Sequence, residues 1–213
     1  MSTKHLTAIL TLTILAGAVY AAPTTVKAIA DGAPLSPAYE FKVTSGSLGI
    51  YTVGQNFRTF CMEAGETFAN GVTYYAVINT AAVKGGTGTS DPLDPRTAYL
   101  YTRYMAGAYG YDFNTENALQ EVIHYIEGER AALSVSNPWS AQAAALYAEA
   151  NASGWTTIGN VRVVNLWTSY DPQTKTYSGF AQDQLVLVPA PGALLLASIG
   201  MAVVGGLRRR QSV

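Results

Sequence analysis

Two apolar segments, one at each end of the chain, limit the part that can fold in water to the residues between them. The first runs from Leu6 to Val19, after a weakly basic start and before the small-residue stretch Val19-Tyr20-Ala21. A basic start, a short apolar run and small residues at its end are typical of a secretory signal peptide. We therefore predict a signal peptide over residues 1–21, removed by signal peptidase, with Ala22 and Ala30 as alternative cleavage positions.

The second apolar segment runs from Gly192 to Leu207 and follows Pro189-Ala190-Pro191-Gly192. Its prolines end any preceding strand, because proline has no N–H to donate to a sheet. With a rise of about 1.5 Å per residue, such a helix only just crosses a hydrocarbon core about 30 Å thick. Arg208, Arg209 and Arg210 come next, and the positive-inside rule keeps them cytoplasmic. Residues 189–213 are therefore expected to insert a transmembrane helix and to leave the preceding body outside.

The order of these elements at the C-terminus resembles a PEP-CTERM sorting signal: a Pro-x-Pro motif, a short apolar helix and an arginine cluster. The resemblance implies that an exosortase processes a precursor anchored in the inner membrane. The product then reaches the cell surface or the extracellular matrix of a Gram-negative-type bacterium. Ala190 stands where the family usually has glutamate, which leaves the exosortase subtype open. The alternative is a plain single-span membrane anchor, which also faces the body outward.

The body, residues 22–188, is large enough for one sizeable core. The whole chain has a formal net charge of -1, and its only basic cluster is the terminal one. Nucleic acids require a concentrated basic surface, so we expect no nucleic-acid partner. The chain holds two histidines, one of them in the predicted signal peptide. We therefore expect no metal site and no cofactor.

The hydrophobic patterning of the body changes from strands to helices and back to strands. Alternating and β-rich segments predict strands at 39–44, 50–53, 57–62, 72–78, 161–166 and 184–188. Three helices are expected between them: one from Pro95 to Met105 capped by Asp94, one from about Thr115 to Arg130 capped by Asn114, and one from Ser140 to Ala152. This order predicts an α+β fold, a β-sandwich or barrel with a helical insertion of about three helices.

Cys61 is the only cysteine of a chain that we expect to be exported. An unpaired cysteine there indicates intermolecular pairing, a reactive thiol or an unusual crosslink, unless it is a small buried hydrophobe. In the second helix, Gln120, His124 and Glu127 share a stripe beside the apolar face. That pattern is also what the polar boundary of an amphipathic helix looks like.

The segments Phe60-Cys61-Met62 and Leu119-Gln120-Glu121-Val122-Ile123-His124 together resemble the thioester domains of bacterial surface proteins. In that family a cysteine after an aromatic residue bonds to a glutamine in a Thr-Gln-x-Ala-Ile-Trp type motif. The second segment matches that motif at Gln120 and Ile123 only. The resemblance implies a Cys61–Gln120 thioester that adheres covalently to an amine-bearing surface or matrix partner.

Formation of such a bond needs a proton donor for the departing ammonia, and His124, Glu63 and Glu127 are the candidates. The reaction is used once, so we do not expect an enzyme. Two other hypotheses stay open at this stage. One is a structural matrix protein of the same fold without the bond. The other is a hydrolase in which Cys61 is the nucleophile and His124 the base.

Overall fold

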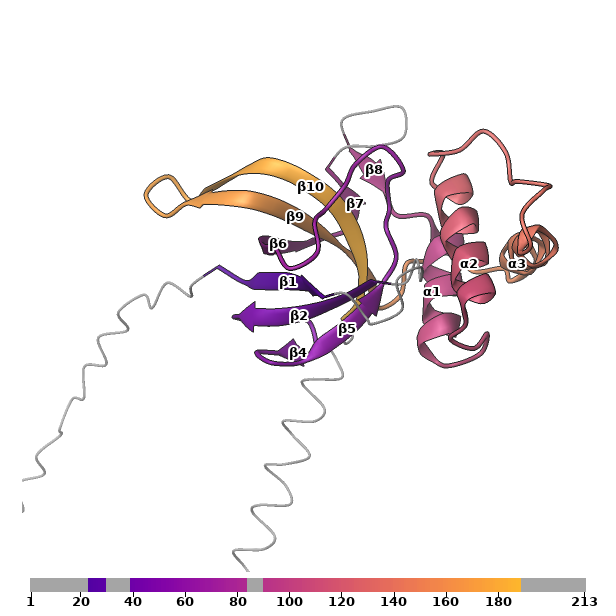
Figure 1. The fold of residues 1–213 in the computed structure, drawn as a ribbon, viewed down its shortest axis with the longest axis horizontal. Helices are drawn as coiled ribbons and strands as arrows, with labels where there is room; N and C mark the ends of the chain where they lie inside the picture. The colour runs from indigo at the N-terminus through magenta and orange to yellow at the C-terminus, as the bar shows by residue number, and fades with distance from the viewer. Residues whose placement is uncertain (1–22, 30–38, 84–89, 189–213) are drawn as a thin grey trace, which may run out of the picture.

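The computed structural model describes residues 23–29, 39–83 and 90–188 (Figure 1). The predicted signal peptide and the predicted PEP-CTERM segment lie outside these ranges. In the described ranges, no helix combines the length and the apolar character that crossing a membrane requires.

A six-stranded antiparallel sheet forms the body, with the strand order β10-β9-β6-β1-β2-β5. Its strands are β1 (Thr25–Ile29), β2 (Tyr39–Ser45), β5 (Asn56–Thr59), β6 (Thr73–Asn79), β9 (Val161–Asp171) and β10 (Thr176–Leu187). Two small antiparallel sheets accompany it: β3 (Ser47–Leu48) with β4 (Tyr51–Thr52), and β7 (Ala81–Ala82) with β8 (Asp91–Pro92).

The six-stranded sheet is not closed. Its edge strands β5 and β10 meet just beyond the end of β5, where Cys61 and Gln184 form an isolated antiparallel bridge. Strand β10 shifts register between Ala181 and Gln184, and this shift interrupts its regular pairing with β9 next to the bridge. The expected α+β class is thus confirmed, whereas the expected sandwich or barrel takes the form of an open sheet whose edges touch at one point.

Three helices lie together at one end of the sheet (Figure 1), between β8 and β9 in sequence. They are α1 (Pro95–Met105), α2 (Phe113–Ile126) and α3 (Ser140–Ala152). The bounds of α1 and α3 agree with the sequence prediction. In α1, the Asp94 side chain accepts a hydrogen bond from the Arg96 N–H, as an N-cap does.

Helix α2 begins and ends earlier than predicted. Its cap is Asp112, whose carboxylate accepts hydrogen bonds from the N–H groups of Asn114 and Thr115, so Asn114 lies inside the first turn. The helix ends at Ile126 because Gly128 has a φ of 82°, a left-handed conformation that terminates helices and that glycine adopts without strain.

Strand β1 and the full length of the β9–β10 hairpin were not predicted. Strand β1 pairs with β6 on one side and β2 on the other, so it is a central strand of the sheet. Strands β9 and β10 pair from Val161 with Leu187 out to Asp171 with Thr176, well beyond the predicted short strands.

The buried apolar side chains form two clusters. One fills the interior of the sheet and includes Phe41, Tyr74 and Leu166. The other joins the helices to the end of the sheet and includes Leu119, Ile123 and Leu185, together with Phe60 and Met62 on either side of Cys61. The second cluster therefore holds helix α2 against the segment that contains the cysteine.

Candidate functional site

The segment Phe60–Met62 crosses from the end of β5 to the edge of β10. The Met62 N–H donates to the Asp183 carbonyl over 2.9 Å, and the Leu185 N–H donates to the Phe60 carbonyl over 3.2 Å. These two bonds bracket the bridge between Cys61 and Gln184. Because both residues are fixed by main-chain pairing and are buried, their side chains meet in a constrained, water-poor setting.

Gln184 presents its side-chain amide to the thiol of Cys61. Its Nε2 donates to Cys61 Sγ over 3.5 Å and to the Gln182 carbonyl over 3.1 Å. The side chain is fully buried, and among the described residues its Oε1 finds no hydrogen-bond partner. Gln184 was not among the residues predicted from the sequence. The available signal was its position at the start of an otherwise apolar predicted strand, where a buried amide requires a reason.

Gln120, the residue predicted to bond with Cys61, also lies beside it, but at the main chain. Its Oε1 accepts from the Cys61 N–H and its Nε2 donates to the Cys61 carbonyl, each over 2.9 Å. The side chain of Gln120 thus pairs with Cys61 as a neighbouring strand would. The structure brings the predicted pair together, and it places the amide of a second glutamine, Gln184, at the sulfur.

His124 lies one turn along α2 from Gln120, and its Nε2 is 2.9 Å from Gln120 Nε2. Since the amide nitrogen can only donate, His124 Nε2 acts as the acceptor, which places the proton of the neutral ring on Nδ1. Nδ1 is buried and has no hydrogen-bond partner among the described residues. Burial, assisted by the charge of Arg130, lowers the pKa of His124 to about 4. The ring is therefore neutral at pH 7.

Glu63 and Asp183 form a buried carboxyl pair next to the bridge. Glu63 Oε2 accepts from the Asp183 N–H over 2.8 Å, while Glu63 Oε1 is buried without a partner in the described part of the chain. The Asp183 carboxylate accepts from Val83 N–H, Asn165 Nδ2 and Leu166 N–H. Burial and the charge of Asp183 raise the pKa of Glu63. Burial also raises the pKa of Asp183, to about 6, but its three donors stabilise the charged form and make it the more acidic of the two carboxyls.

Glu127 lies at the end of α2 and contacts the start of α1. Its two carboxylate oxygens accept from the Asp94 N–H over 3.3 and 3.4 Å. Burial raises its pKa to about 8. These contacts give Glu127 a role in joining two helices, away from the Cys61–Gln184 bridge.

The thiol of Cys61 is protonated at neutral pH. Burial, with a contribution from Glu63, raises its pKa to about 12, and the hydrogen bond from Gln184 opposes this rise only in part. A thiol–histidine hydrolase needs an activated thiol next to its base. Here the near nitrogen of His124 bonds to Gln120, and both the thiol and the ring are uncharged.

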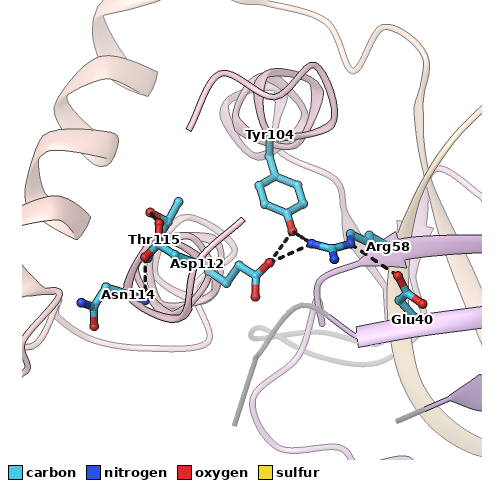
Figure 2. Close-up of polar contacts among 7 residues, drawn as sticks. Glu40, Arg58, Tyr104, Asp112, Asn114 and Thr115 are labelled. Atoms are coloured by element: carbon cyan, nitrogen blue, oxygen red, sulfur yellow. Dashed lines mark hydrogen bonds and ion pairs between the residues drawn. The ribbon is translucent and has the colours of Figure 1, made fainter. Parts of the chain in front are cut away.

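A polar network holds helices α1 and α2 against the strands that lead to Cys61 (Figure 2). Arg58 of β5 donates from Nη1 to Tyr104 Oη and to Glu116 Oε1, over 3.3 and 3.2 Å. Its Nε forms an ion pair with Glu40 of β2 over 3.5 Å. Tyr104 in turn donates to Glu116 over 2.7 Å. One arginine therefore ties two strands to two helices, which fixes Gln120 of α2 relative to Cys61.

The sequence matches no protein-family model, and no curated protein matches it. Among solved structures, the chain is similar to the N-terminal thioester domain of the fibronectin-binding protein SfbI from Streptococcus pyogenes. The alignment has a TM-score of 0.46 at 12% identity and covers 79% of this chain and 94% of that chain. At this TM-score, the chemistry of the site has to be judged from its own geometry.

Proposed function

We propose that this chain is an exported surface protein with an internal thioester between Cys61 Sγ and the side-chain carbonyl carbon of Gln184. The contact of 3.5 Å between Gln184 Nε2 and Cys61 Sγ supports this proposal. It is made across an antiparallel bridge between two buried residues. Because folding already holds the two groups together, little freedom is left to lose on the way to the transition state.

The reaction is internally balanced. Cys61 Sγ bonds to the Gln184 side-chain carbonyl carbon, the bond from that carbon to Nε2 breaks, and ammonia leaves with the proton of the thiol. No oxidant or cofactor is required. When an amine of a partner then attacks the same carbon, the carbon–sulfur bond breaks, an amide joins the partner to Gln184, and the thiol of Cys61 is restored. The cycle runs once, so the domain is an adhesive rather than a turnover enzyme.

Among the three acid–base candidates, we assign the proton transfer to Glu63. Its carboxyl lies against the bridge, because Oε2 accepts from the main chain of Asp183, the residue before Gln184. Its raised pKa keeps it protonated at pH 7, so it can donate a proton to the leaving amine and take the proton of the thiol in its place. His124 accepts a hydrogen bond from Gln120, and Glu127 accepts one from the Asp94 N–H at the start of α1.

Gln120 has a positioning role in this scheme. Its Oε1 and Nε2 both bond to the Cys61 main chain, whereas Nε2 of Gln184 contacts the sulfur. This is the physical reason for moving the proposed crosslink from Gln120 to Gln184. The partner stays as expected from the sequence, an amine-bearing surface or matrix molecule.

Intact mass spectrometry of the purified mature protein, prepared without amine buffers, tests the proposal. We expect a mass lower than the sequence mass by one ammonia, a deficit that methylamine converts to an adduct on Gln184. Cys61→Ser and Gln184→Met should each abolish the deficit, and Gln120→Met should retain it in the folded protein. An adduct on Gln120 would assign the bond to that residue instead.

A full sequence mass together with a thiol that labels freely in the native state would refute the thioester. It would support the alternative, a structural matrix protein of the same fold. Hydrolysis of a model thioester that is lost in Cys61→Ala would favour the hydrolase hypothesis instead.

A further inference from the structure

Five aromatic rings form a continuous row on strands β6, β9 and β10. Ring centroids are separated by 4.7 Å for Phe180 and Trp167, 6.0 Å for Trp167 and Tyr177, 4.8 Å for Tyr177 and Tyr170, and 5.7 Å for Tyr170 and Tyr75. We call these five residues the aromatic row. Phe180 is 45% exposed and the other four are half-buried. Each ring therefore keeps part of its surface in contact with solvent.

The aromatic row lies on the outer face of the sheet. Tyr74 and Leu166 belong to the interior cluster, so strand alternation directs their neighbours Tyr75 and Trp167 outward. The β9–β10 hairpin extends past the other strands, and its turn lies at the end of the sheet away from the helices (Figure 1). Gln184 lies near the opposite end of β10. The row is thus a separate surface from the thioester site.

A glycine lies between two rings of the row. Tyr177 and Phe180 are three residues apart, and both contact Trp167. Gly179 between them has a φ of 70°, and an added Cβ would lie 2.0 Å from Thr168 Oγ1. Glycine therefore fits here without strain or clash, and it lets the backbone of β10 approach Thr168 closely beside the ring contacts.

Two lysines adjoin the row on the same outer face. Lys27 of β1 and Lys42 of β2 are direct cross-strand partners, and both are exposed. Thr25 pairs with Tyr75 and Lys27 pairs with Thr73, which makes Lys27 a diagonal neighbour of Tyr75. Like charges directly opposite each other are unfavourable in a sheet. Among the described residues neither ammonium has an ion-pair partner, so an external anion would relieve the repulsion.

We propose that this face binds an anionic polysaccharide, with sugar rings packed on the aromatic row and carboxylates paired with Lys27 and Lys42. Aromatic side chains combine a large apolar surface with polar tips, which suits sugars that carry both C–H faces and hydroxyls. Three exposed residues with the same strand alternation as Trp167 add hydroxyls, those of Ser169, Thr176 and Ser178. A nucleic-acid strand fits less well, because it needs a cation for nearly every phosphate.

Binding of polygalacturonate and of its methyl ester, followed by tryptophan fluorescence and affinity electrophoresis, tests the proposal on the mature protein. We expect polygalacturonate to bind and the uncharged ester to bind more weakly. The double variant Lys27→Gln, Lys42→Gln should lower the affinity for the acidic polymer about tenfold and make that binding insensitive to salt. Tyr177→Ser and Phe180→Ser should each lower the affinity for both polymers by about tenfold.

The matched control is Phe113→Ser, which removes a ring that is 43% exposed and packs on Trp139, away from the row. It should leave both affinities unchanged. Cys61→Ser should also bind normally, because the proposal does not depend on the thioester. Three results would overturn it: no binding of either polymer, binding that the lysine and ring variants do not alter, or equal binding of a single-stranded nucleic acid.

Discussion

Gln120 and Gln184 flank the same cysteine, and the structure predicts opposite consequences for their replacement by methionine. Methionine keeps the approximate length and volume of glutamine while removing the amide. Gln120→Met removes two hydrogen bonds of 2.9 Å and leaves the N–H and carbonyl of the buried Cys61 without partners. With about 1 kcal/mol for each bond and a further cost for an unpaired buried donor, unfolding should become easier by about 2–4 kcal/mol.

Gln184→Met should lower the free energy of unfolding by less, about 1 kcal/mol or below. The Oε1 of Gln184 already lacks a partner, and its Nε2 donates to one carbonyl, that of Gln182, besides the sulfur. Methionine therefore removes an unsatisfied acceptor from a fully buried position. The two substitutions thus separate the positioning role proposed for Gln120 from the crosslinking role proposed for Gln184.

Urea denaturation in a Cys61→Ser background measures both costs without a contribution from the crosslink. We expect a large fall in midpoint for Gln120→Met, a small one for Gln184→Met and the same m-value for both. In the presence of Cys61, mass spectrometry should show the reverse order, with the ammonia deficit lost only in Gln184→Met. If Gln120→Met were the milder change in stability, the positioning role of Gln120 would be wrong.

Three further predictions address the crosslink, the buried charges and the hairpin. A Cys61–Gln184 bond joins residues that are 123 positions apart in the sequence. Opening the bond with methylamine should therefore lower Tm by on the order of 10 °C in scanning calorimetry. An unchanged Tm would contradict the bond. The pKa of His124 lies near 4, below its unfolded value of 6.5, so its share of stability should fall as pH drops through that window. The pKa of Glu127 lies near 8, above its unfolded value of 4.5, so its share should fall as pH rises through that range. In a plot of unfolding free energy against pH, His124→Asn should reduce the slope on the acidic side, and Glu127→Gln should reduce it on the alkaline side. If each variant kept the slope of the unsubstituted protein, these pKa shifts would be wrong. Gly179→Ala should destabilise the protein by about 2 kcal/mol or more in urea denaturation, since it combines a positive φ with a clash against Thr168, whereas Gly54→Ala has the strain without the clash and should cost less.

The helical part of the fold was predictable because its signals are local. Asp94 and Pro95 mark the start of α1, and the bounds of α3 also matched the prediction. The start of α2 was misplaced because Asp112 and Asn114 are both good caps, and only the geometry shows that Asp112 accepts the two N–H bonds. Strand β1 was missed because Thr25–Ile29 is only five residues long and lies next to the predicted signal-peptide cleavage site.

The resemblance named Cys61 and Gln120 together, and the structure places them side by side. Gln184 could not be found in the same way. Its position beside the thiol depends on the pairing of two sheet edges far apart in sequence and on a register shift in β10. Hydrophobic periodicity reports which face of a strand is buried, but not which distant residue it meets. The acid–base role that we propose for Glu63 likewise depends on Asp183, which the strand pairing brings to it.

The place of Gln184 along β10 has a mechanical consequence. Strand β10 ends at Leu187, three residues after Gln184, and the chain continues from there toward its C-terminus. If a partner is bonded to Gln184 and the protein is held from its C-terminal side, tension passes through this short stretch alone. The sheet, the helices and the aromatic row then carry no load. An acceptor at Gln120 would instead place α3, β9 and most of β10 under tension, so a pull could unfold the domain. The proposed bond at Gln184 would make the adhesion independent of the mechanical strength of the fold.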